Sequence, residues 1–174
     1  MKKNFLFLTV LLVLQNITVA QFDKVSLRVD GLTCSACSYS TQSSILKLDF
    51  VDNVKMDLNS HIAIITFKPD KKISIDKIAT KVYDAGFSVG TLSAEFNFKS
   101  TTLTDGNCFE YNGDLYHFEQ IPENTKLDGI KTITFISSKY MTVKEFKKWK
   151  KNIKKDACKK PDNFLGKVYN IILA

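Results

Sequence analysis

Short runs of alternating apolar and polar residues mark the first part of the chain. Residues 25–29 alternate in this way, and the same two-residue period returns at 54–58 and 63–67. Successive side chains of a strand point to opposite faces, so these runs predict three half-buried strands. Residues 87–92 are expected to form a fourth strand.

Two segments between these strands show the three-to-four-residue period of an amphipathic helix. In the first, Thr41, Ile45 and Leu48 would form the inward face. The second is expected to begin at the cap residue Ser74 and to stop at Gly86. Its predicted inner face consists of Ile75, Ile78, Ala79 and Val82. The resulting order, βαββαβ, predicts an α+β fold, a ferredoxin-like sandwich over residues 21–95.

Residues 96–174 predict a second small β-rich α+β domain. Asn112-Gly113 between two aromatic-rich runs predicts a hairpin with a type I′ turn. Further strands are expected over 130–138 and 166–174. From Thr142 onward, lysines surround an apolar stripe at helical spacing, which predicts a basic amphipathic helix. The stripe consists of Val143, Phe146, Trp149, Ile153 and Ala157.

Charge also divides the chain, near residues 95–101. Residues 21–96 contain 9 Lys and Arg against 9 Asp and Glu, whereas residues 97–174 contain 14 Lys against 9 acids, a balance of +5. A lysine-rich helical face is usually solvated, but it could also contact membrane headgroups or an acidic partner.

The first twenty residues have the layout of a cleavable secretory signal. Two lysines precede an apolar run over residues 5–14, and a short polar stretch ends at Ala20. The apolar run is about half the length needed to span a bilayer. The expected division is therefore a signal peptide at 1–20, a first domain at 21–95 and a second at 96–174. We expect the protein to be exported, to a periplasm or as a secreted protein, which argues against nucleic acid as a partner.

Cys34 and Cys37 follow the first predicted strand in the stretch "DGLTCSACSYS". A C-x-x-C pair at a helix start could be a metal clamp, a redox pair or a structural staple. The positive end of a helix dipole favours thiolate, the form that binds metals. Two thiolates without a third strong ligand suit two-coordinate Cu(I) or Hg(II), whereas zinc normally takes three or four protein ligands.

The segments "GLTCSAC", "VDNVKMDLNSHIAIITFKP" and "DAGF" resemble the heavy-metal-associated domain of copper chaperones and metal-transporting ATPases, and they are similar to periplasmic mercury-binding proteins. The resemblance covers about residues 24–94, and Leu32 departs from the family's usual methionine beneath the loop. It implies that Cys34 and Cys37 bind a soft metal ion, Cu(I) above Hg(II). The implied role is a metallochaperone that passes the ion to a metal-transporting ATPase or another metal-accepting protein.

Three other residues are candidates for minor contributions to this site. Thr33 stands where family members that handle zinc or cadmium often carry aspartate, and its presence favours copper(I). His61 could supply a third ligand from the turn between the second and third strands, although a solvated turn residue is the simpler interpretation. Phe87 resembles the family's aromatic residue beside the metal loop, but it could equally be a core residue.

The remaining cysteines, Cys108 and Cys158, are expected to form a disulfide, which is common in small exported domains. A second metal site that also uses His117 is the alternative. The sequence contains no plausible nucleophile–base pair, phosphate-binding loop or H-E-x-x-H motif, so we do not expect an enzyme. Periplasmic thiol–disulfide exchange by Cys34 and Cys37, and an envelope domain with inert cysteines, are the other hypotheses.

Overall fold

The structure is a computed structural model that describes residues 21–103, 106–154 and 157–174. The predicted signal peptide, residues 1–20, lies outside the described residues. Among the residues described, no helix has both the length and the apolar character that crossing a bilayer requires.

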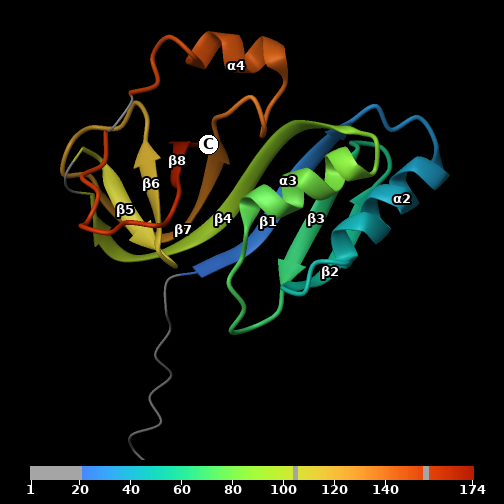
Figure 1. Ribbon diagram of the computed structural model, residues 1–174, viewed down its shortest axis with the longest axis horizontal. Helices are drawn as coiled ribbons and strands as arrows, with labels where there is room; N and C mark the ends of the chain where they lie inside the picture. Colours follow the sequence, from blue (N-terminus) through green and yellow to red (C-terminus); the bar gives the residue numbers. More distant parts are fainter. Residues whose placement is uncertain (1–20, 104–105, 155–156) are drawn as a thin grey trace, which may run out of the picture.

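The first six elements follow the predicted βαββαβ order (Figure 1). Their strands are neighbours in the order β2-β3-β1-β4, and every pairing is antiparallel. Helices α2 and α3 lie on the same face of this part of the sheet, which is the ferredoxin-like arrangement. The bounds are β1 Gln21–Asp30, α2 Ser35–Leu46, β2 Val51–Asp57, β3 Ile62–Phe67, α3 Ile75–Asp84 and β4 Ser88–Thr102.

Apolar residues at the predicted positions form the core between these helices and the sheet. Val25, Leu27 and Val29 of β1 are fully buried, and so is the whole predicted inner face of α3. Each buried valine, leucine or isoleucine side chain contributes roughly 1.5–3 kcal/mol relative to leaving it exposed. The Ser74 hydroxyl accepts a hydrogen bond from the Lys77 N–H at 3.4 Å, as expected of the residue that caps α3.

Strand β4 runs straight through the expected domain boundary at residues 95–101. Its buried positions continue from Leu92 and Ala94 to Phe96 and Phe98, so the alternating pattern extends beyond the ferredoxin-like part. Strand β7, Lys126–Phe135, pairs with β4 over this stretch. The two halves, which were expected to be separate domains, therefore share one strand and one sheet in the structure.

The second half extends this sheet to eight strands, in the order β2-β3-β1-β4-β7-β8-β6-β5. Strand β8 is antiparallel to β7 and parallel to β6. Asn112 and Gly113 both have positive φ, 53° and 78°, which confirms the predicted tight turn between β5 and β6. The bounds are β5 Cys108–Tyr111, β6 Asp114–Phe118 and β8 Val168–Leu173.

A cluster of aromatic rings joins the two halves into one core. The Phe96 ring of β4 lies 5.0 Å from Phe22 of β1 and 5.3 Å from Phe109 of β5, measured between ring centroids. Phe22 in turn contacts Tyr111 and Tyr116 of the β5–β6 hairpin. The hairpin, although last in the order of strands, therefore packs against the first strand of the chain.

Helix α4 is shorter and more exposed than expected. It spans only Val143–Trp149, and none of its residues is buried. Of the predicted apolar stripe, Trp149 is only half-buried, and Val143 is exposed. The early end has a physical reason, because the lysines from residue 147 to residue 154 would stand at repulsive three- and four-residue spacings on a longer helix.

The Asp76 carboxylate in the first turn of α3 connects the first half of the protein to the second through hydrogen bonds. It accepts hydrogen bonds from Lys139 Nζ at 2.7 Å and the Tyr140 hydroxyl at 2.6 Å, and Lys167 Nζ also contacts it. Burial by itself would raise the pKa of Asp76, but these hydrogen bonds outweigh it and hold that pKa well below its usual range. Burial, together with the contact with Asp76, raises the pKa of Tyr140 well above its usual range.

Candidate metal site

The loop between β1 and α2 holds Cys34 and Cys37 at the start of a helix. Gly31, with φ of 94°, turns the chain out of β1, and Leu32 is buried beneath the loop. Cys34 is the N-cap residue of α2, with extended backbone angles, and its sulfur accepts a hydrogen bond from the Cys37 N–H at 3.2 Å. The two sulfurs therefore share the first turn of the helix, as the sequence predicted.

In the structure Cys34 and Cys37 are joined to each other by a disulfide. This differs from the expectation of a free pair, and the local geometry accounts for the difference. The helix start brings the two Cα atoms to 5.2 Å, within the usual span of a disulfide. Cys34 is exposed and Cys37 is half-buried, so a thiol or phosphine can reach the bond from solvent. The structure thus presents the oxidised form of the site.

The electrostatic surroundings of the pair favour negative charge on sulfur once it is reduced. The first turn of α2 carries no acidic residue, so the positive end of the helix dipole is not neutralised there. The Thr33 hydroxyl lies 4.0 Å from Cys37 Sγ, at the limit for a hydrogen bond to sulfur. Thr33 is therefore beside the site and supplies a weak polar neighbour in place of a carboxylate.

Phe87 and His61 both lie at the cysteine end of the sheet. A Cβ on Gly31 would lie 3.7 Å from the Phe87 ring, so this half-buried ring packs against the start of the loop. The His61 carbonyl accepts a hydrogen bond from the Val29 N–H at 3.0 Å, which brings the β2–β3 turn to the same end as the loop. The described residues nevertheless contain no cluster of three potential metal-ligating side chains, so His61 does not complete one.

Two exposed apolar side chains near this loop were not predicted. Tyr39 of α2 is 71% exposed, and Leu58, expected as an inward strand residue, is 56% exposed. Both line a shallow groove of about 420 Å³ between α2 and β2. The exposure of Tyr39 could have been predicted from the sequence, because Tyr39 falls outside the Thr41–Ile45–Leu48 stripe that faces the core. Leu58 is exposed because β2 ends at Asp57 and the chain turns there.

Cys108 and Cys158 form the second disulfide of the structure. Both are buried, and their Cα atoms lie 5.7 Å apart. His117 lies opposite Cys108 in the β5–β6 pairing, as the alternative metal site would require. Its Nδ1 instead faces the buried Glu119 carboxylate at 3.2 Å, while both sulfurs are occupied by the disulfide.

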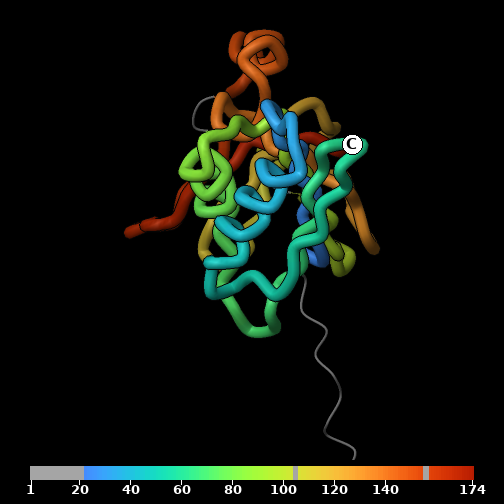
Figure 2. The backbone as a smooth tube through the Cα atoms, turned by 90° about the vertical axis from the view of Figure 1, so that its right-hand side faces the viewer, coloured from blue at the N-terminus to red at the C-terminus, as the bar shows by residue number. Residues whose placement is uncertain are grey.

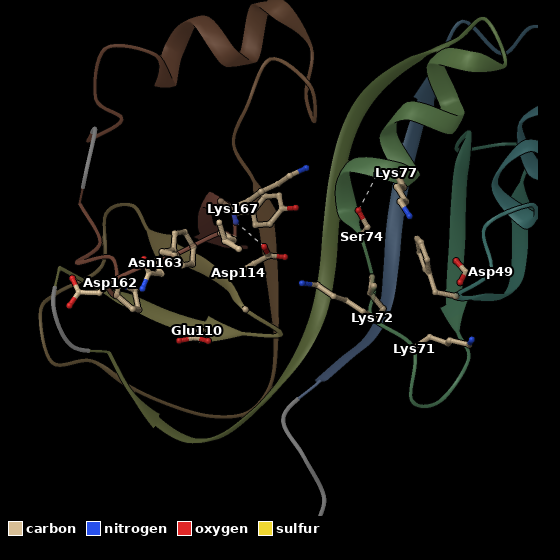
Figure 3. Close-up of a pocket in the computed structure, with 18 residues that line it drawn as sticks. Asp49, Lys71, Lys72, Ser74, Lys77, Glu110, Asp114, Asp162, Asn163 and Lys167 are labelled. Carbon is tan, nitrogen blue, oxygen red and sulfur yellow. Dashed lines mark hydrogen bonds between the residues drawn. The ribbon is translucent and has the colours of Figure 1, made fainter.

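A wide cleft lies away from the cysteine loop, between the loop that precedes α3 and the β6–β8 region (Figure 3). Its volume is about 910 Å³, and neither Cys34 nor Cys37 lines it. The Asp114 carboxylate accepts a hydrogen bond from the Lys167 N–H at 2.8 Å on one of its walls. Its formal charges balance and favour neither anion nor cation: Lys71, Lys72, Lys77 and Lys167 against Asp49, Glu110, Asp114 and Asp162.

Comparison with known proteins identifies relatives of the first half. The heavy-metal-associated domain family matches residues 26–88. The mercuric transport protein periplasmic component of Serratia marcescens is 34% identical over 87 residues, which cover 50% of this chain and 93% of the relative. Human copper-transporting ATPase 2 is 36% identical over 74 residues, 42% of this chain and 5% of the ATPase.

Among solved structures, oxidised MerP from Ralstonia metallidurans CH34 is 36% identical, with a TM-score of 0.35. That match covers 41% of this chain and 97% of MerP.

Proposed function

Since the chain belongs to the heavy-metal-associated domain family, we propose that it carries a soft metal ion on Cys34 and Cys37 and passes it to another protein. This is a metal-binding family and not a family of enzymes. One observation carries the proposal: an exposed sulfur at the N-cap of α2 is hydrogen-bonded to the backbone of a second cysteine one turn along. Both sulfurs are therefore positioned before any ion arrives.

Metal binding requires reduction of the Cys34–Cys37 disulfide first. A dithiol reductant supplies two electrons and two protons, the S–S bond breaks, and the reductant leaves as its own disulfide. The two cysteines then lose their protons to solvent as the ion binds, since thiolates are the ligands. The unneutralised start of α2 favours this charge on sulfur.

Cu(I) is the first candidate ion. Two thiolates without a neighbouring carboxylate provide two soft ligands, which suits linear coordination, and Thr33 offers only a hydroxyl. Hg(II) is the second candidate because the same two-sulfur geometry suits it, and because several relatives that the chain covers almost completely are periplasmic components of mercuric transport.

The proposed acceptor is a metal-transporting ATPase or another metal-accepting protein, and the proposed location is the periplasm. The location is supported by the relatives named as periplasmic components of mercuric transport, and the acceptor by the relative named as a copper-transporting ATPase. Exposure of Cys34 supports transfer by ligand exchange, because an incoming thiolate can attack the ion while Cys37 still holds it. The exposed side chains of Tyr39 and Leu58 beside the loop provide apolar surface for such a partner.

A thiol–disulfide exchange protein is the second candidate function, because the pair is observed in its oxidised form and Cys34 is accessible. The two functions differ in what the reduced protein does. A carrier binds metal tightly and reduces disulfide substrates poorly, whereas an exchange protein does the reverse.

The decisive experiment titrates the phosphine-reduced protein with Cu(I), Hg(II) and Zn(II) against competing chelators in the absence of oxygen. Cys34→Ser/Cys37→Ser should abolish tight binding of the soft ions. Cys108→Ser/Cys158→Ser is the control variant, and its folding is checked by circular dichroism. It removes the same number of sulfurs but should still bind the soft ions tightly. Equal affinity in the wild type and the first variant would reject the proposal, and efficient reduction of insulin disulfides would favour the exchange protein.

A further inference from the structure

Residues 143–154, here termed the lysine-rich segment, form a strongly basic surface. The segment holds six lysines against one acid, Glu145, so its formal charge is +5. Glu145 pairs with Lys148 at 2.8 Å, which leaves five lysines in excess. All six side chains are exposed: Lys144, Lys147, Lys148, Lys150, Lys151 and Lys154.

The segment also presents apolar side chains that the core does not enclose. No residue of α4 is buried, Val143 is 66% exposed, and Phe146 and Trp149 are half-buried. Lysines beside partly exposed aromatic and aliphatic residues are typical of segments that lie at a lipid–water interface.

The lysine-rich segment lies at the same end of the sheet as the metal loop. The Thr142 N–H, just before α4, donates to the Gly90 carbonyl at 3.2 Å, and Met141 forms a bridge with Thr91. Ser88, two residues before Gly90, pairs with Asp30, the last residue of β1 before the cysteine loop. Both views of the molecule agree with this placement, with α4 and the β1–α2 loop at one end (Figures 1 and 2).

We propose that the lysine-rich segment binds an anionic phospholipid surface. Its positive charge is attracted to the headgroups, and Val143, Phe146 and Trp149 enter the interface between them. Apolar side chains interspersed with lysines on one short segment are the arrangement of an interfacial helix, which favours a lipid surface over an acidic protein. If the proposed carrier function also holds, docking would bring the cysteine loop toward the membrane, where a transporter could take the ion.

Trp149 is the only tryptophan of the chain, so its fluorescence reports directly on this segment. Residues 21–174, which include every described element, are mixed without metal with vesicles of pure phosphatidylcholine or of phosphatidylcholine and phosphatidylglycerol. We expect co-sedimentation and a blue shift of Trp149 emission only with the anionic vesicles. Both signals should weaken as salt rises to about 0.15 M, where charges are screened within roughly 8 Å.

Two variants with equal loss of charge provide the control. Lys147→Gln/Lys150→Gln/Lys151→Gln should weaken partitioning by about a hundredfold, since each lysine near an anionic surface contributes roughly fivefold. Lys55→Gln/Lys68→Gln/Lys71→Gln removes three exposed lysines from the ferredoxin-like half and should change it little.

Equal effects of the two variants, or equal binding to neutral vesicles, would overturn the proposal. Absence of binding to anionic vesicles would also overturn it and would leave an acidic protein as the partner of this surface. Because no metal is present, none of these results depends on the carrier function, which the metal titration tests separately.

Discussion

Replacing Asp76 with asparagine tests the contact that fastens the second half of the protein to α3. The carboxylate accepts hydrogen bonds from Lys139, Tyr140 and Lys167, and only 15% of its side chain is exposed. Asparagine keeps the shape of the side chain but removes its charge. Its amide group would also direct N–H donors toward groups that are themselves donors.

The expected loss follows from the exposure of each partner. The lysines are 39% and 59% exposed, so each ion pair is discounted for solvent to roughly 0.5 kcal/mol. The Tyr140 hydroxyl is buried and donates to a charged acceptor, an interaction of about 2 kcal/mol. Asp76→Asn should therefore lower the free energy of unfolding by about 3 kcal/mol near neutral pH.

Urea denaturation of both proteins, followed by circular dichroism, measures this difference. The pKa of Asp76 is lowered in the folded state, so its contribution is fully present above the unfolded carboxyl pKa, about 3.9. The contribution is lost as pH falls from that value toward the folded pKa. The difference in the free energy of unfolding between wild type and variant should therefore be largest near neutral pH and should decrease below about pH 4.

Asp84→Asn is the matched control. Asp84 lies at the end of the same helix and pairs with Lys81 at 3.2 Å, but its side chain is 53% exposed. Its replacement should cost less than about 1 kcal/mol. The reasoning is wrong if Asp76→Asn costs no more than this control, or if its cost does not change with pH.

Two further predictions concern the stability of the protein and whether its two halves unfold together. Cys108→Ala/Cys158→Ala opens a crosslink of sequence separation 50 and should lower the free energy of unfolding by about 4 kcal/mol in the chain-entropy model. Urea denaturation without reductant measures this loss, and an unchanged midpoint would contradict it. Phe96→Ala removes a buried ring at the junction of the halves and should cost roughly 3–5 kcal/mol. Trp149 fluorescence and backbone circular dichroism should still report a single transition, and two separated transitions would show that the halves unfold independently.

The ferredoxin-like half was predictable because its local signals agree with its tertiary structure. Val25, Leu27 and Val29 alternate toward one core, and Ser74 caps a helix whose predicted inner face is fully buried. The cysteine loop followed from the same reasoning, since a strand and then a helix must place Cys34 and Cys37 at a helix start.

The remaining features depend on contacts that lie far apart in the sequence. Asp76 could be identified as an acidic residue in a first helical turn, but Lys139 and Lys167 follow it by 63 and 91 residues. The shared sheet was missed because the change in charge near residues 95–101 suggested a boundary there. Phe98 continues the alternation of β4 past that point, and this was the signal that the strand did not end.

The position of β4 inside the sheet limits how copies of this protein could join edge to edge. In the ferredoxin-like half alone, both β2 and β4 would have unpaired backbone groups, but here β7 pairs with β4. The outer strands of the described sheet are β2 and β5. On β2 the charged residues Asp52, Lys55 and Asp57 discourage uncontrolled strand addition. A sheet that continues from one copy into the next would therefore have to begin at β2 or β5.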